Sequence, residues 1–239
     1  MDWFSFSIAG IMVYLAIAIF IGGTAFRIDQ WMTVPKSGVR LGLFPRATSR
    51  KGRLLQLSKD TFVFPQVRDV DKIMWIAVLG LHAALVAAFV GHMRLLTEFT
   101  PLANSLGSAG MDRFALISGG TIGIVLMISL LYLLMRRFKS PYKDISTPED
   151  YALLVLVLLV VLMGNHLRFF GDVHASEYRE YVHSLFTLSP TFPAALAASA
   201  TKWSLVAHVF FANLLLIYLP FSKLVHFAGS FAVNLVRSE

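Results

Sequence analysis

The sequence predicts an all-α integral membrane protein with five transmembrane helices in a single domain over residues 1–239. Hydrophobic residues make up 56% of the chain and charged residues only 15%, whereas a soluble domain carries roughly 25% charged residues. The mean hydropathy is +0.68. Five apolar stretches are also long enough to cross a bilayer, which takes about 20 residues of helix. Too little polar surface remains to cover a globule in water.

The predicted spans cover residues 4–26, 73–96, 114–135, 151–170 and 203–227. The first begins after Asp2 rather than after basic residues, and it is longer than the apolar core of a signal peptide. We therefore expect it to be retained as the first helix. The fourth helix should start at Thr147-Pro148-Glu149-Asp150, which has the order of an N-cap, a first-turn proline and two first-turn acids.

A basic loop over residues 27–72 connects the first two spans and is the most polar part of the chain. Prolines at positions 35, 45 and 65 predict short turns in this loop. We expect a surface helix around Gly52 to Lys59.

Lysine and arginine residues are divided unevenly between the two sides of the predicted bundle. One side holds sixteen: Arg27, Lys36, Arg40, Arg46, Arg50, Lys51, Arg53, Lys59, Arg68, Lys72, Arg136, Arg137, Lys139, Lys143, Lys223 and Arg237. The other side holds five: Arg94, Arg113, Arg168, Arg179 and Lys202. Because basic loops stay in the cytoplasm, the N-terminus is predicted to be periplasmic and the C-terminus cytoplasmic. The net charge of +7 then reflects topology and contact with the lipid bilayer, and no nucleic-acid partner is expected.

The chain contains no cysteine. It therefore cannot hold an iron–sulfur cluster through thiolates, form a disulfide or attach a c-type haem covalently.

Four of the seven histidines fall inside predicted spans: His82, His92, His208 and His226. An ionisable side chain at membrane depth is costly, so it marks a functional site by default, although a single histidine can simply bond to a neighbouring helix. Two pairs of histidines on two helices favour haem binding instead. Neutral imidazoles from facing helices are good axial ligands for haem iron and need no cysteine. We therefore expect two haem b groups.

The predicted topology pairs His92 with His208 on the outer side and His82 with His226 on the inner side. Two haems at two depths would form an electron relay across the bilayer. The ten-residue step on the second helix corresponds to a rise of about 15 Å, but the eighteen-residue step on the fifth corresponds to about 27 Å. These two separations can be reconciled if the helices and the haem planes are tilted and the fifth helix is distorted at Pro220.

The residues near these histidines are of types that suit the flat haem ring and its propionate groups. Small residues flank each ligand, as they also do at simple helix–helix contacts. They are Gly80, Ala83, Ala84, Gly91, Ala207, Ala228 and Gly229. Five basic residues could bind the haem propionates, or could alternatively mark the membrane interface. They are Arg94, Arg113 and Lys202 on the outer side and Lys72 and Lys223 on the inner side.

The histidine pattern resembles the cytochrome b (gamma) subunit of respiratory nitrate reductases and its relatives. The similar features are Trp75…His82…Gly91-His92-Met93-Arg94, the spacing from His208 to His226, and Pro220-Phe221-Ser222-Lys223-Leu224-Val225-His226. Helix 4, with Asp150-Tyr151-Ala152-Leu153-Leu154 and Gly164…Leu167-Arg168-Phe169-Phe170, and the long basic first loop are most similar to the membrane cytochrome b of the sulfite-reduction-associated Dsr complex. The resemblance covers roughly residues 1–235.

This resemblance implies a quinone-reactive subunit that is not a complete enzyme alone. Menaquinol or ubiquinol would be oxidised near the outer haem, and electrons would pass to a cytoplasmic iron–sulfur subunit related to heterodisulfide reductases. A periplasmic multihaem cytochrome c and a second membrane subunit are further implied partners, in the cytoplasmic membrane of a bacterium or archaeon. The outer-side lysine of nitrate reductases has no counterpart between His92 and Lys139. The quinone-site candidates are Arg94, Asp112, Arg113 and His166.

Several alternatives remain open from the sequence. The loop over residues 171–201 could bind a metal or accept quinol protons through its polar residues, but we expect a solvated loop that docks an outer partner. Those residues are Asp172, His174, Glu177, Arg179, Glu180 and His183. His166 is either a quinone or propionate donor or an interfacial cap. For the whole chain, the alternatives are a nitrate reductase gamma subunit, a histidine-containing transporter and a structural membrane anchor.

Overall fold

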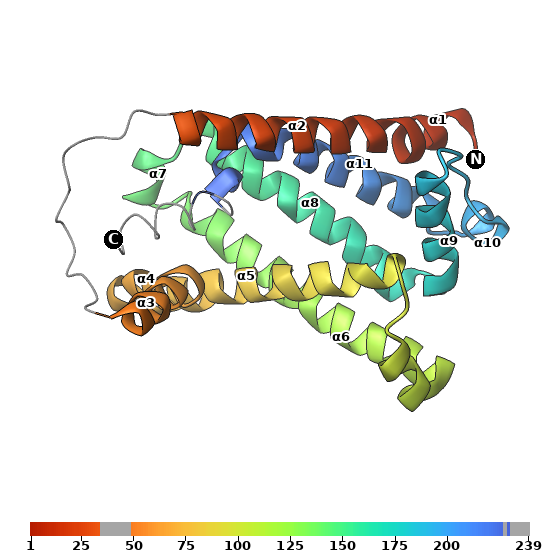
Figure 1. The fold of residues 1–239 in the computed structure, drawn as a ribbon, viewed down its shortest axis with the longest axis horizontal. Helices are drawn as coiled ribbons and strands as arrows, with labels where there is room; N and C mark the ends of the chain where they lie inside the picture. Colours follow the sequence, from red (N-terminus) through yellow and green to blue (C-terminus); the bar gives the residue numbers. More distant parts are fainter. Residues whose placement is uncertain (34–48, 227–228, 230–239) are drawn as a thin grey trace. The chain divides into compact units, whose positions relative to one another are not determined.

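The computed structural model describes residues 1–33, 49–226 and 229, and every regular element in these residues is helical (Figure 1). Five helical stretches are long and apolar enough to cross a membrane: Trp3–Thr33, Lys72–Leu95, Thr100–Arg136, Pro148–Phe170 and Lys202–Phe221. The predicted all-helical class with five candidate spans is confirmed, while the orientation of the termini stays a prediction. Several residues of the sequence predictions lie outside the described residues: Pro35, Lys36, Arg40, Pro45, Arg46, Phe227, Ala228 and Arg237.

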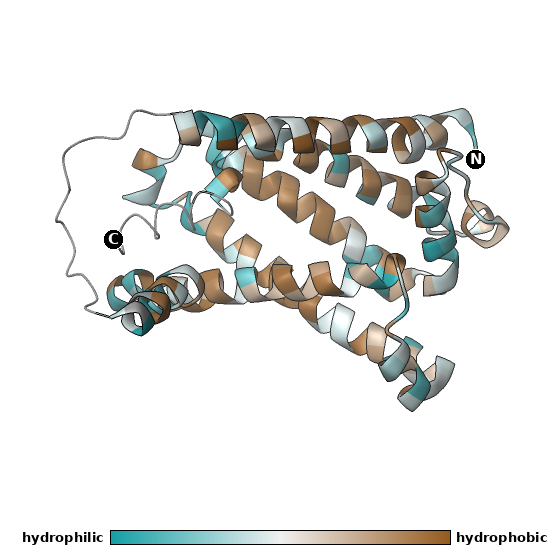
Figure 2. Ribbon diagram, in the orientation of Figure 1, coloured by the Kyte–Doolittle hydropathy of each residue, from teal (hydrophilic) through white to brown (hydrophobic). Residues whose placement is uncertain are grey.

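The helices follow one another in a simple order along the chain. The N-terminal span comprises α1 (Trp3–Phe6), a π-helical turn (Ser7–Ile11) and α2 (Met12–Thr33). Next come α3 (Arg50–Phe62), α4 (Pro65–Val70), α5 (Lys72–His92), the 3₁₀ turn η2 (Met93–Leu95) and α6 (Thr100–Arg136). The rest are α7 (Tyr142–Ile145), α8 (Pro148–Phe170), α9 (Ala175–Phe186), α10 (Ala194–Ala198), α11 (Lys202–Tyr218), η3 (Leu219–Phe221) and η4 (Lys223–Val225). Figure 2 shows hydrophobic residues along the long helices and hydrophilic residues on α9.

The chain divides into two compact parts, which we describe separately. Residues 1–15 and 80–215 form the first part, and residues 16–79 and 216–239 form the second.

Helices α6 and α8 pack closely in the first part because small residues line α6. A β-carbon at Gly123 would overlap the side chain of Asn165, and one at Gly120 would lie 3.1 Å from the Phe169 ring. The Asn165 amide also donates a 3.0 Å hydrogen bond to the Gly123 carbonyl. Beside this contact lies an apolar cluster of Ala84, Leu126, Leu130 and Val161. Close approach at glycines is how helices associate where surrounding lipid is as apolar as their side chains.

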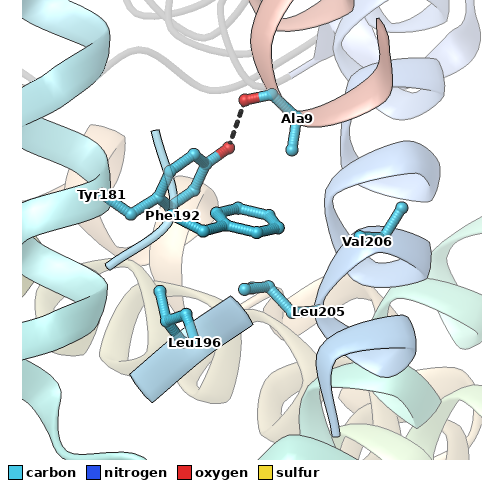
Figure 3. Packing of buried hydrophobic residues seen from close by; sticks show 6 residues of the cluster. All are labelled: Ala9, Tyr181, Phe192, Leu196, Leu205 and Val206. Atoms are coloured by element: carbon cyan, nitrogen blue, oxygen red, sulfur yellow. Dashed lines mark hydrogen bonds between the residues drawn. The ribbon is translucent and has the colours of Figure 1, made fainter. Parts of the chain in front are cut away.

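A second cluster in the same part ties the N-terminal turns to α9, α10 and α11 (Figure 3). It comprises Ala9, Tyr181, Phe192, Leu196, Leu205 and Val206. The buried Tyr181 hydroxyl donates a 2.6 Å hydrogen bond to the Ala9 carbonyl. Tyr14 similarly donates to the Leu185 carbonyl at 2.7 Å. These bonds satisfy polar groups that would otherwise be buried without a partner.

In the second part, a side-chain hydrogen bond links the end of α3 to the start of α5. The Trp75 indole nitrogen donates a 2.6 Å hydrogen bond to the Val63 carbonyl, directly after α3. Helix α3 confirms the surface helix predicted around Gly52 to Lys59 and carries exposed Leu54 and Leu55. Elsewhere in this part, Arg27 donates a 3.1 Å hydrogen bond to the Pro220 carbonyl.

Helix boundaries differ from the predicted spans where polar residues extend a helix or a proline ends one. Helix α8 starts at Pro148 as predicted, with Thr147 and Asp150 forming a reciprocal capping box. The third span begins at Thr100 rather than Phe114, with a non-helical glycine at Gly107 (φ 69°). The sequence prediction missed this extension because residues 100–113 are small and polar.

The fifth span and the loop over residues 171–201 also depart from expectation. The α-helix ends at Tyr218, before Pro220, whose ring cannot continue the hydrogen-bond ladder. The expected solvated loop instead contains α9 and α10, and Tyr181 is buried. The apolar spacing Tyr178, Tyr181, Val182, Leu185 is the helical pattern that would have revealed α9.

Candidate functional site

Two of the four predicted ligands, His92 at the end of α5 and His208 on α11, face each other in the first part. Their ring centroids are 6.3 Å apart and their planes differ by only 9°. The residues are separated by more than one hundred positions in the sequence, so tertiary packing brings the rings together. The structure therefore places the predicted outer pair in one site.

A backbone carbonyl fixes each of these rings through Nδ1. His92 Nδ1 lies 2.7 Å from the Ala88 carbonyl oxygen, and His208 Nδ1 lies 2.9 Å from that of Val160 on α8. A carbonyl oxygen can only accept, so Nδ1 carries the proton in both rings. In the neutral rings, Nε2 then keeps its lone pair, and among the described residues nothing donates to it.

The distance between the two rings is compatible with imidazoles that would bind one haem iron. A metal–imidazole bond is about 2 Å and the ring centre lies about 1 Å beyond it, so two rings on opposite sides of one ion have centroids about 6 Å apart. Histidines that bind metals characteristically donate their other ring nitrogen to a carbonyl or carboxylate. Gly164 leaves space beside the His208 ring, because a β-carbon there would lie 3.1 Å from Cε1 of His208.

The other two predicted ligands belong to separate parts of the chain. His82 is half-buried on α5 in the first part, and His226 follows η4 in the second part, with Nδ1 3.0 Å from the Lys223 carbonyl oxygen. Because α11 ends at Tyr218, the helical rise of about 27 Å estimated between His208 and His226 does not apply. The pairing of His82 with His226 stays a prediction.

A charged cluster follows His92 directly. The Arg94 side chain donates to Glu98 at 2.8 Å, and Arg179 of α9 donates to the same carboxylate at 2.5 Å and to the Arg94 carbonyl at 2.9 Å. His183, one turn later on α9, donates a 2.8 Å bond to the Leu96 carbonyl. The hydrogen bond from Arg94, together with that from Arg179, lowers the pKa of Glu98 to about 2. We call Arg94, Glu98, Arg179 and His183 the α9 clip.

The remaining quinone-site candidates have contacts of their own. Asp112 is exposed and lies 3.4 Å from Nδ1 of His174, while Arg113 is exposed on α6. His166 Nδ1 shares a 2.9 Å hydrogen bond with the Ser204 hydroxyl. Within the described part of the chain, no hydrogen bond or ring contact joins these three residues to His92 or His208.

Two other expectations for the outer side have a structural outcome. Lys202, a candidate propionate cation, is held by Asp2 at 2.6 Å. Over residues 1–33, 49–226 and 229, no three histidine, aspartate or glutamate side chains converge to hold a metal ion. The α9 clip was not predicted, because it joins residues some eighty positions apart and involves backbone carbonyls.

Comparison with known proteins identifies similar chains. A sequence model described as nitrate reductase gamma subunit matches residues 66–239. A protein of Archaeoglobus fulgidus named Hdr-like menaquinol oxidoreductase cytochrome b-like subunit is 27% identical over 257 residues, covering 94% of this chain and 77% of that protein. Its namesake in Archaeoglobus profundus is 23% identical over 255 residues, covering 90% of this chain and 74% of that protein.

Proposed function

The chain belongs to the nitrate reductase gamma subunit family, and on this premise we propose that it is the di-haem b membrane subunit of a respiratory oxidoreductase complex. It exchanges electrons between the quinone pool and an iron–sulfur partner. The family match confirms the predicted resemblance to the nitrate reductase gamma subunit and its relatives. The observation that carries the proposal is the facing His92–His208 pair, with both Nδ1 atoms bonded to carbonyls.

His92 and His208 would hold the outer haem, and His82 and His226 the inner one. When bound, haem supplies one-electron chemistry, while the protein sets its position and potential through axial ligands, burial and charge. The carbonyls of Ala88 and Val160 hold the two outer rings in the ligand tautomer. The space beside Gly164 keeps the His208 ring from being displaced.

Oxidation of a quinol also releases protons, which must reach acceptors on the outer side. The exposed Asp112–His174 pair, with His174 Nδ1 3.4 Å from the Asp112 carboxylate, is our candidate acceptor. We keep Arg94, Arg113 and His166 as candidates for positioning the quinone headgroup. Arg94 is already held by Glu98, so its role would be electrostatic.

Partners follow from the relatives' name and from the sequence motifs. The two Archaeoglobus proteins are named as subunits of an Hdr-like menaquinol oxidoreductase. We propose a cytoplasmic heterodisulfide-reductase-like iron–sulfur subunit for this chain, with a periplasmic multihaem cytochrome c and a second membrane subunit as further partners. The proposed setting is dissimilatory sulfur metabolism in a Dsr-type complex, and a respiratory nitrate reductase is the second candidate.

The first test is a dithionite-reduced minus oxidised spectrum of the purified chain, with haem quantified by pyridine haemochrome. We expect a b-type spectrum with about two haems per chain, as four axial histidines require. A transporter or a structural anchor would give colourless protein. Absence of haem in protein purified with its partners would overturn the proposal.

Replacing His208 with alanine separates the two proposed sites. We expect His208→Ala to lose one haem and keep the other, because only the outer pair loses a ligand. His174→Ala, which removes an exposed histidine outside both pairs, serves as the matched control and should keep both haems. Retention of both haems in His208→Ala would refute the ligand assignment.

A further inference from the structure

Arg168 lies on the same face of α8 as the groups that contact His208. The Val160 carbonyl bonds the ring, and Gly164 leaves room beside it. Arg168 follows at the next position of this series, since residues four apart lie one above the other on a helix. Its side chain therefore lies about one turn outward from the proposed outer haem site.

The Arg168 side chain reaches α6. Its Nε would lie 2.9 Å from a β-carbon at Gly119, so the glycine makes the room that the guanidinium occupies. The Arg168 and Arg94 guanidinium groups are close enough to repel each other. Arg94 follows His92 by two residues, so Arg168 adjoins both ligand-bearing segments.

Arg168 differs from its two neighbouring arginines in having no carboxylate partner among the described residues. Arg94 and Arg179 already share the carboxylate of Glu98. Arg168 makes no ion pair with any described acidic residue. Asp172 and Glu177 lie near Tyr178, which is itself near Arg168, but neither carboxylate forms an ion pair with this guanidinium. The exposed Arg168 guanidinium at the end of α8 is therefore available to an anion.

We infer that Arg168 binds the propionate carboxylates of the haem held by His92 and His208. This inference rests on the proposed function, because it requires a haem at that pair. Arginine suits the task, since its planar fork of donors matches a carboxylate with two parallel hydrogen bonds. Arg94 adds positive charge beside it, while Glu98 and Arg179 hold Arg94 in place.

Redox titration of each haem in the membrane-bound complex tests the inference. Reduction adds an electron, so a nearby cation favours the reduced haem and raises its midpoint potential. In Arg168→Gln the midpoint of the outer haem should fall while that of the inner haem stays unchanged. Arg168→Lys should recover part of the loss. Lys139→Gln removes the same charge from an exposed position near the other end of α6 and should change neither midpoint.

Arg168→His provides a second measurement in one folded protein. Histidine loses its charge as the pH rises through about 6.5. As the pH rises through this value, the midpoint potential of the outer haem should therefore fall more steeply in Arg168→His than in the parent protein.

The outcomes distinguish this inference from the proposed function. Suppose that both variants bind two haems, that Arg168→Gln keeps the parental midpoints and that Arg168→His keeps the parental pH dependence. This result would overturn the role of Arg168 but would not contradict the two haem sites. That result would indicate that its partner is another anion, such as a lipid phosphate. Absence of haem from the unmutated complex would instead overturn the proposed function.

Discussion

At the scale of single residues, the ligand chemistry depends on two carbonyl groups that are far apart in sequence. Ala88 is on the same helix as His92 and one turn before it, so this bond is local. Val160 belongs to α8, so the His208 ring is oriented only after two helices have packed. Each bond fixes which nitrogen keeps a lone pair, and thus which atom can bind iron.

Gly164 is the residue whose side-chain volume most directly affects His208. In Gly164→Ala the new β-carbon would lie 3.1 Å from the ring, so the ring must shift by a few tenths of an ångström. Gly164→Val adds two methyl groups and should displace the ring. We expect a small spectral change for alanine and loss of one haem for valine, measured by pyridine haemochrome on protein purified from membranes. Equal haem content in all three proteins would contradict a close packing of Gly164 on the ligand.

Glu98 predicts a pH dependence for the α9 clip. Its pKa falls from an ordinary 4.5 to about 2 in the folded protein. A carboxylate with a depressed pKa contributes stability that is full above the ordinary pKa and is lost as the pH falls towards the folded value. The stability advantage over Glu98→Gln should therefore be constant above about pH 4.5 and shrink between 4.5 and 2. Thermal unfolding in detergent across this range checks the prediction, and an advantage independent of pH would disprove it.

The residue types of the site were predictable from the sequence, but their bonding was not. Histidines inside apolar spans are visible because such residues are rare there. The carbonyls that orient them belong to Ala88 and Val160, whose side chains carry no chemistry. The role of Arg168 was hidden in the same way, because a basic residue at a helix end also fits the interface of any membrane helix.

At the scale of helices, close contact between α6 and α8 depends on glycine. Gly123→Val should lower the free energy of unfolding by about 1–3 kcal/mol, as overpacking does elsewhere, because its β-carbon would overlap Asn165. Gly22→Val is the matched control, since nothing lies within 4 Å of that position. Thermal unfolding in detergent compares the two variants. Equal destabilisation would mean that the loss comes from valine in a helix and not from the helix contact.

Helix positions were predictable where they depend on hydropathy and capping, and less so elsewhere. The Thr147–Asp150 capping box fixes the start of α8 as predicted. The amphipathic α9 was not predicted, because its polar residues are also typical of a solvated loop. Its buried Tyr181 packs in an apolar cluster. Pro220 was expected to distort the fifth helix, and its actual effect is to end the α-helix at Tyr218.

At the scale of the whole molecule, the distribution of basic residues predicts which side each loop faces. The absence of cysteine makes this orientation testable, because a single introduced cysteine is then the only thiol in the chain that a reagent can label. Ser176→Cys, at the start of α9, should react with a membrane-impermeant maleimide in intact spheroplasts. Ser140→Cys, between α6 and α7, should react only after the membrane is opened. The reverse pattern would overturn the predicted orientation.

Family and fold class could be predicted from the sequence because apolar length, histidine spacing and the Pro220–His226 motif are local features. The inner ligand pair could not be established in the same way. His82 and His226 lie in separate parts of the chain, so their pairing depends on how these parts associate.

The facing of His92 and His208 also has a consequence for biosynthesis. His92 leaves the ribosome long before His208, and the Val160 carbonyl that orients the second ring is synthesised between them. The proposed outer haem site would therefore be incomplete until α11 has been inserted. A ribosome stalled after α8 would leave a nascent chain with one outer ligand and no means of retaining the iron porphyrin there. Haem loading at the proposed outer site would thus follow the insertion of α11.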